Sequence, residues 1–163
     1  ASGVGFMGPL VKTSINEVPR EDYTVPFGKV RVYREGTDVS LVCVGLAVHQ
    51  ALESAETLEA MGISAEVVDL RSLVPLDREG IIESVSKTGR LVVADEDYHS
   101  YGVSGEVVAS VIEHDASIFK AAPQRVCVPD VSIPFSRPLE NSILPLADRI
   151  TAAAIKTMEK NDE

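Results

Sequence analysis

The stretch ISAEVVDLRSLVPLD, residues Ile63–Asp77, decides the fold of this chain. Its apolar run Ala65–Leu70 is short and predicts a β-strand. Pro75 blocks the continuation of that strand, and Asp77 is a residue type that caps the first turn of a helix. A strand that leads through a short loop into a helix predicts a parallel crossover connection, and therefore a parallel sheet.

Strand-like and helical segments alternate on both sides of this stretch. Lys29–Arg34 alternates charged and apolar residues, as a half-exposed edge strand does, and the turn Glu35–Asp38 predicts that it runs antiparallel to its successor, Val39–Val44. Alternating strands and amphipathic helices predict a three-layer α/β/α sandwich with a mainly parallel sheet. The other expected elements are helices at Val48–Met61 and Arg78–Thr88, a strand at Leu91–Ala94, a helix carrying Val107, Val108, Val111 and Ile112, a strand at Arg125–Val128, a loop at Pro129–Pro138, and a C-terminal helix that buries Ile150, Ala153, Ala154 and Met158.

The length of 163 residues and the 45% hydrophobic content predict one domain with a single well-buried core. We expect residues 28–160 to form this domain, residues 1–27 to be an extended linker or a cloning remnant, and residues 161–163 to be a charged tail. The run GVGFMG near the start has the spacing of a dinucleotide-binding loop. No strand precedes it and Pro9 follows it, so we do not interpret it as one.

The net charge of −10 argues against nucleic-acid binding, which needs a basic patch, and against binding to anionic membranes. An acidic surface of this kind is either simply well solvated or steers a basic protein partner toward the chain. The longest apolar runs are only a few residues, and we expect neither a membrane span nor a signal peptide.

The two cysteines, Cys43 and Cys127, each lie in an apolar, strand-like run. This placement predicts small buried residues of a reducing compartment rather than a disulfide framework. We therefore expect the cytoplasm, or the mitochondrial matrix if the source is a eukaryote.

The most polar stretch of the chain follows the expected strand Leu91–Ala94. Carboxylates beside an imidazole, as in Asp95–His99, can form an acid/base or metal-binding group. However, adjacent residues on an extended chain point in different directions, and no second group of ligands occurs in the sequence. A structural or interface loop is therefore favoured over catalysis or metal binding, and no catalytic, cofactor-binding or metal-binding residue is assigned.

Two glycines and a serine open the helix that follows this loop. Free N–H groups at such a helix start can bind a small anion, or the glycines can simply allow tight packing. The candidate interface or anion loop comprises Asp95, Glu96, Asp97, Tyr98, His99, Gly102, Ser104 and Gly105.

Five segments of the sequence also carry a family resemblance. They are EVPREDYTVPFGK (Glu17–Lys29), REGTDVSLVCVG (Arg34–Gly45), GISAEVVDLRSLVPLD (Gly62–Asp77), KTGRLVVADED (Lys87–Asp97) and PDVSIPFSRPLE (Pro129–Glu140). With them, the chain from about Val18 to Lys156 resembles the C-terminal domain of the β subunit of thiamine-dependent 2-oxo acid dehydrogenases. That family includes the pyruvate, branched-chain 2-oxo acid and acetoin dehydrogenases, and is related to transketolase C-terminal domains.

The resemblance implies a five-stranded sheet with one antiparallel edge strand, and it implies that the chain is part of an enzyme. The whole enzyme decarboxylates a 2-oxo acid with thiamine diphosphate and magnesium and transfers the acyl group to lipoamide. In the family the cofactor is held by the α subunit and activated by the N-terminal domain of the β subunit. This chain has no Gly-Asp pair, so we expect the fragment alone to bind no cofactor and to be inactive.

The resemblance implies an assembly role for the domain itself. Its implied partners are a second β subunit, the α subunit and the basic subunit-binding domain of the acyltransferase core. Two departures from the family stand out: Asp95 where many members have histidine, and Lys120 where several have an acidic residue. The alternative is a free-standing interaction or small-anion-binding module with the same fold. The sequence does not distinguish pyruvate, branched-chain and acetoin substrates.

Overall fold

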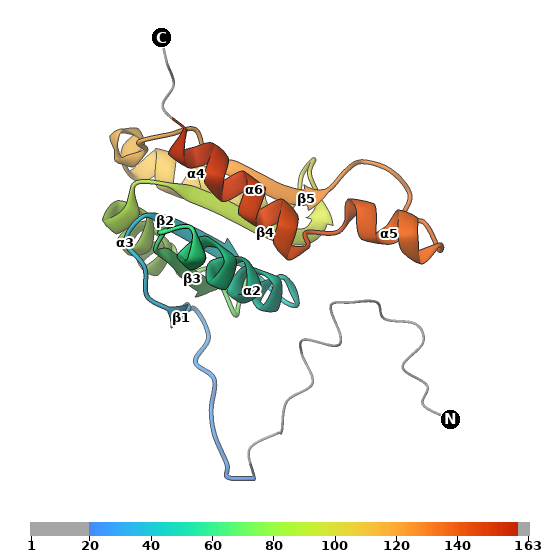
Figure 1. The fold of residues 1–163 in the computed structure, drawn as a ribbon. Coiled ribbons are helices and arrows are strands. Elements are labelled where there is room, and N and C mark those ends of the chain that lie inside the picture. Colours follow the sequence, from blue (N-terminus) through green and yellow to red (C-terminus); the bar gives the residue numbers. More distant parts are fainter. Residues whose placement is uncertain (1–19, 160–163) are drawn as a thin grey trace.

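The computed structural model describes residues 20–159 as one sheet with helices on both faces (Figure 1). Most of the expected linker 1–27 and the whole tail 161–163 lie outside the described residues. In chain order the elements are β1 (Arg31–Arg34), β2 (Val39–Cys43), α2 (Ala47–Ala60), β3 (Ala65–Asp69), α3 (Arg78–Thr88), β4 (Leu91–Tyr98), α4 (Val103–Asp115), the 3₁₀ helix η1 (Ala116–Ile118), β5 (Gln124–Val128), α5 (Arg137–Ile143) and α6 (Ala147–Met158).

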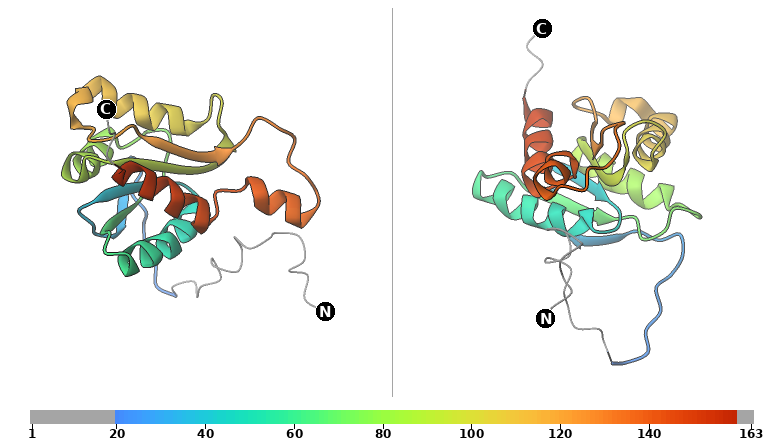
Figure 2. Two further views of the ribbon diagram at one scale, coloured as in Figure 1. Left: turned by 45° about the horizontal axis from the view of Figure 1, so that its top comes forward. Right: turned by 90° about the vertical axis from the view of Figure 1, so that its right-hand side faces the viewer.

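The sheet has five strands in the order β1-β3-β2-β4-β5. The pairs β2–β3, β2–β4 and β4–β5 are parallel, and β1 is the antiparallel edge strand. Helices α2 and α6 cover one face, and α3 and α4 cover the other (Figure 1, Figure 2). The predicted three-layer α/β/α sandwich and its mainly parallel sheet are therefore confirmed.

Strand residues alternate between two apolar clusters because successive side chains on a strand point to opposite faces. Leu41 and Val67 belong to the cluster under α2 and α6, whereas Val42 and Val68 belong to the cluster under α3 and α4. All four side chains are completely buried. The central strands are thus covered on both faces, as their nearly continuous apolar sequences predict.

The edge strand β1 does not form the expected hairpin with β2. It lies beside β3, with Val32 opposite Val68. The turn Glu35–Asp38 instead crosses the start of β3, where the amides of Thr37 and Asp38 donate to the carbonyl of Ser64 over 3.1 and 2.8 Å. A side chain at Gly36 would place its Cβ 2.2 Å from backbone atoms of β3, so only glycine allows this crossing.

Asp77 caps α3 as the sequence predicts. Its carboxylate accepts from the amide of Gly80, in the first turn of the helix, over 3.3 Å. It also accepts from the amide of Val30 over 3.0 Å, just before β1 begins. The Asp77 carboxylate therefore links the start of α3 to the residue just before β1.

Two elements differ from the sequence expectation. Strand β4 continues through the acidic residues to Tyr98 instead of ending at Ala94. The expected loop Pro129–Pro138 ends in a short helix, α5, which has Pro138 in its first turn. Proline is compatible with that position because the first amides of a helix need no partner within the helix.

Both cysteines are buried, as predicted, with Cys43 at 0% and Cys127 at 3% exposure. Burial raises the pKa of both thiols. No helix within residues 20–159 combines the length and apolar character needed to cross a membrane.

Candidate functional site

The candidate loop begins inside β4 rather than after it. Asp95 is only 4% exposed, and its Oδ1 accepts from the amide of Asp97 over 3.1 Å. Its Oδ2 is buried without a hydrogen-bond partner among the described residues. Burial raises the pKa of Asp95, and the nearby charge of Asp97 adds to the effect. A carboxyl group in this environment holds its proton more tightly than it would in water.

Glu96 is half-buried and lies near the start of α2. Burial and the neighbouring Asp95 raise the pKa of Glu96, while the amides of Leu46 and Ala47 favour its charged form. Asp95 accepts from the amide of Asp97 on its own strand, whereas Glu96 meets the amides of Leu46 and Ala47 at the start of α2.

His99 is separated from these carboxyl groups. Its amide donates to the carbonyl of Val128 over 2.8 Å, and its carbonyl accepts from the Arg125 guanidinium over 3.0 Å. The imidazole Nδ1 also lies 3.5 Å from that guanidinium. Within residues 20–159, no group of three or more His, Cys, Asp or Glu side chains could hold a metal ion. The assignment of no catalytic or metal-binding residue to this loop stays a prediction.

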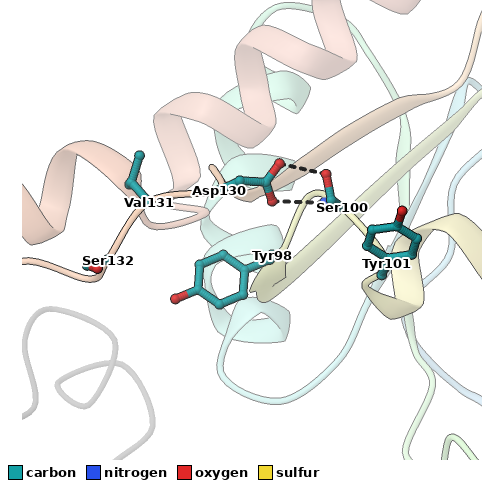
Figure 3. Close-up of a pocket in the computed structure, with 6 residues that line it drawn as sticks. All are labelled: Tyr98, Ser100, Tyr101, Asp130, Val131 and Ser132. Carbon is teal, nitrogen blue, oxygen red and sulfur yellow. Dashed lines mark hydrogen bonds between the residues drawn. The ribbon is translucent and has the colours of Figure 1, made fainter.

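A hydrogen-bonded pair ties this loop to the end of β5. The amide and hydroxyl of Ser100 donate to the two carboxylate oxygens of Asp130 over 3.2 and 2.6 Å (Figure 3). These bonds lower the pKa of Asp130. Sequence reasoning did not single out Asp130, although it follows a strand that was expected to end at this edge of the sheet. Parallel strands bring their carboxyl ends to one edge, which is the signal that could have found it.

An open pocket of about 320 Å³ surrounds this pair. Tyr98 and Tyr101 flank it, and Val131 borders it on the side of the loop that follows β5 (Figure 3). Tyr101 is fully exposed and has a positive φ of 64°, a conformation that is uncommon for a tyrosine. The pocket thus presents aromatic and polar groups at the carboxyl edge of the sheet, where ligands and partners of such folds usually bind.

The glycine and serine positions at the start of α4 serve packing. A Cβ on Gly102 would lie 2.3 Å from the carbonyl oxygen of Tyr98, so a side chain does not fit there. Ser104 is fully buried, and its hydroxyl accepts from the thiol of Cys127 over 3.2 Å. Gly105 has more room, since a Cβ there would lie 3.8 Å from the Arg125 guanidinium. Anion binding by this turn stays a prediction.

A second polar cluster, at the opposite edge of the sheet, was not anticipated from the sequence. The ammonium of Lys87 pairs with Glu66, which is 1% exposed, and with Glu35 over 2.7 Å. These residues border a cavity of about 330 Å³ between β1 and α3. The amide of Gly36 also donates to Glu66 over 3.4 Å. The arrangement fixes the edge strand to the sandwich.

Comparison with known protein families gives one match that spans most of the chain. The family described as "Transketolase, C-terminal domain" matches residues 28–150. The chain is 47% identical over 143 residues to the β subunit of acetoin:2,6-dichlorophenolindophenol oxidoreductase of Cupriavidus necator, which covers 88% of this chain and 42% of that subunit.

Two relatives from Bacillus subtilis are similar to the same region. The pyruvate dehydrogenase E1 component subunit beta is 43% identical, covering 92% of this chain and 46% of that subunit. The 2-oxoisovalerate dehydrogenase subunit beta is also 43% identical, covering 84% of this chain and 42% of that subunit. The chain therefore spans less than half the length of these relatives.

A solved structure shares the fold. It is named "Split gene transketolase, inactive beta4 tetramer", with a TM-score of 0.74 and 37% identity, and it covers 88% of this chain and 46% of that chain. At this identity and TM-score, the likeness extends from the sequence to the arrangement of the elements.

Proposed function

The chain belongs to the transketolase C-terminal domain family, and we propose that it is the C-terminal domain of the β subunit of a thiamine-dependent 2-oxo acid dehydrogenase. The observation that carries this proposal is the agreement among the relatives. Those named for acetoin, pyruvate and 2-oxoisovalerate are all β subunits of oxidoreductases or dehydrogenases, at 43–47% identity. The whole enzyme would decarboxylate a 2-oxo acid and transfer its acyl group to lipoamide, in the cytoplasm of a bacterium or in the mitochondrial matrix.

The three relatives differ by only four percentage points of identity while their names give different substrates. Similar identity to relatives with different substrates is expected if this domain does not shape the substrate pocket.

We propose that this chain does not itself hold thiamine diphosphate or its magnesium ion. Residues 20–159 contain no group of carboxylates, histidines or cysteines that could hold the metal. Ser104, at the start of α4, is fully buried, and its hydroxyl accepts a hydrogen bond from the thiol of Cys127. We therefore assign no step of the reaction to this chain, and propose that the α subunit and the N-terminal half of the β subunit hold the cofactor.

We propose assembly as the domain's own contribution: pairing with a second β subunit, contact with the α subunit, and docking to the acyltransferase core. Support for docking comes from the charge of −10, which would attract a basic subunit-binding domain. The end of the candidate loop, from Asp97 to Tyr101, is exposed and is available to a partner. The Ser100–Asp130 bonds hold this surface in place.

An isothermal titration of the chain with the basic subunit-binding domain of the cognate acyltransferase tests docking. Electrostatic docking predicts binding at low salt that weakens as salt is added, because exposed charges are screened. A matched titration with Asp97→Asn and Asp130→Asn variants would show whether the loop contributes. Absence of binding at low salt would contradict docking through this domain.

A further inference from the structure

Strand β1 forms one edge of the sheet, and β3 is the strand beside it in the part of the chain that the structure describes. Figure 1 and Figure 2 show β1 at the rim of the sandwich. In an antiparallel pair, every second residue of a strand points its amide and carbonyl away from the neighbouring strand. The outer side of β1 therefore offers backbone donors and acceptors with which a further strand could pair.

The sequence around β1 is basic, although the chain as a whole is acidic. Residues 23–34 contain three Lys or Arg residues and no Asp or Glu, whereas the net charge of the chain is −10. Two of the three cations have carboxylates nearby: Lys29 lies 3.6 Å from Asp77, and Arg34 lies 3.0 Å from Glu59. The third cation, on β1 itself, is available to a partner.

This third cation is Arg31, which is exposed and has no ion pair among residues 20–159. Its guanidinium carbon lies 4.3 Å from the centre of the Tyr33 ring. Stacking of this kind fixes the guanidinium group but leaves the N–H groups at its edge free to donate to a carboxylate. Arg31 therefore presents a positioned cation on the open edge of the sheet.

The two faces of β1 differ in character. Arg31 and Tyr33 share one face, as their contact shows, and Val32 points to the other face. Val32 is 39% exposed and borders the cavity between β1 and α3, whose lining includes three glutamates and one lysine. An added strand would gain from carboxylates on the Arg31 face and from apolar side chains on the Val32 face. Acidic and apolar residues that alternate along the strand meet both conditions.

The cations also decide which strands can pair with β1. Charged residues on an edge strand protect it against pairing with other copies of the same edge, because like charges would then lie opposite one another. They give no protection against an acidic strand, which they attract. Nucleic acid is a poor alternative, since three cations on a chain with a net charge of −10 do not make an extended basic patch.

We propose that β1 is a docking site for an extended, acidic segment of a partner protein, which adds a strand to the sheet. Main-chain hydrogen bonds to the outer side of β1 supply the attachment, and the side chains on its two faces supply the selectivity. Carboxylates of the segment meet Arg31, and its apolar side chains lie against Val32. The contact is distinct from the pairing and docking proposed above, because it needs a basic surface rather than an acidic one.

Fluorescence anisotropy of a short labelled peptide that alternates glutamate and valine tests this contact, with the full chain as titrant at low salt. We expect saturable binding. The same peptide with N-methyl groups on alternate amides keeps its charges but cannot complete the hydrogen-bond ladder, so we expect it not to bind. Arg31→Glu should weaken binding of the unmodified peptide at least about fivefold, because it replaces the attracting cation with a repelling charge.

Arg20→Glu is the matched control, because Arg20 is exposed and lies outside residues 23–34. It changes the net charge by the same amount and should leave binding unchanged. Absence of binding to the parent chain, equal binding of the methylated peptide, or equal weakening by the two substitutions would overturn the inference. The methylated peptide is compared on the unaltered chain, so that result does not depend on the folding of a variant.

Discussion

The ammonium group of Lys87 on α3 lies against the carboxylate of Glu66 on β3, although the two residues are 21 positions apart in the chain. Glu66 is 1% exposed, whereas the side chain of Lys87 is 41% exposed. A buried carboxylate is costly unless its charge is paired and hydrogen-bonded. The pair therefore adds an ionic contact between α3 and the sheet to the apolar packing of Ile81 and Val85.

Replacing that ammonium should destabilise the fold. Lys87→Met keeps the apolar stem but removes the ammonium group that pairs with the buried Glu66. We expect the free energy of unfolding in urea to fall by about 1–3 kcal/mol at neutral pH. Glu35→Gln removes only the exposed partner of Lys87 and should cost less than Lys87→Met. Equal losses in the two variants would contradict the role given to Glu66.

Asp77 should act both as a helix cap and as the anchor of β1. Asp77→Ala removes the bonds to Gly80 and Val30, and we expect a loss of about 2 kcal/mol in the free energy of unfolding. Asp77→Asn, which can still cap the helix, should lose less. Thermal or urea unfolding of the three proteins checks this order, and unchanged stability in Asp77→Ala would contradict it.

The same carboxylate should make stability depend on pH. Burial alone would raise the pKa of Asp77, but the amides of Val30 and Gly80 and the charge of Lys29 outweigh it and lower the pKa below 3.8. A lowered pKa in the folded state contributes stability that is present above pH 3.8 and is lost as the pH falls through the lower folded value. The advantage of the parent chain over Asp77→Asn should shrink in this acid range.

Asp95 should have the opposite pH dependence. Burial raises its pKa above 3.8, so the folded chain holds this proton more tightly than the unfolded chain. Stability then falls as the pH rises from 3.8 to the folded value. Asp95→Asn keeps the acceptor for the Asp97 amide and should be more stable than the parent chain at pH 7, with no advantage well below pH 3.8. A less stable Asp95→Asn at pH 7 would contradict this account.

The two thiols should be unreactive in the folded chain. Cys43 and Cys127 are both buried, and burial raises the pKa of each, so little thiolate is present at neutral pH. A thiol reagent should label the native protein slowly and both cysteines rapidly in denaturant. Rapid labelling of Cys43 without denaturant would contradict its place in the central sheet.

Local patterns were sufficient to predict most of the sandwich from the sequence. The apolar runs of β2 and β3, the helical spacing in α2 and the Asp77 cap each depend on residues close together in the chain. Pairing of β1 with β3 could not be predicted in this way, because it depends on where a turn crosses a strand that comes later in the sequence.

The missed features share a similar cause. The last residues of β4 were not predicted as strand because they include acidic residues, although Asp95 is buried. Helix α5 has seven residues and buries none of them, so no apolar periodicity marks it. The candidate loop was proposed from residues that follow one another in β4 and α4, whereas the bonding of Ser100 to Asp130 and of His99 to Arg125 depends on β5 lying alongside.

The most direct test of the central claim is a domain exchange. Residues 28–159 of this chain would replace the matching C-terminal part of the Bacillus subtilis pyruvate dehydrogenase β subunit, to which the chain is 43% identical, and the hybrid would be produced with that enzyme's α subunit. We predict that the hybrid assembles with the α subunit and transfers acetyl groups from pyruvate to lipoamide, with substrate choice set by the recipient. A hybrid that folds but neither binds the α subunit nor supports this reaction would contradict the claim.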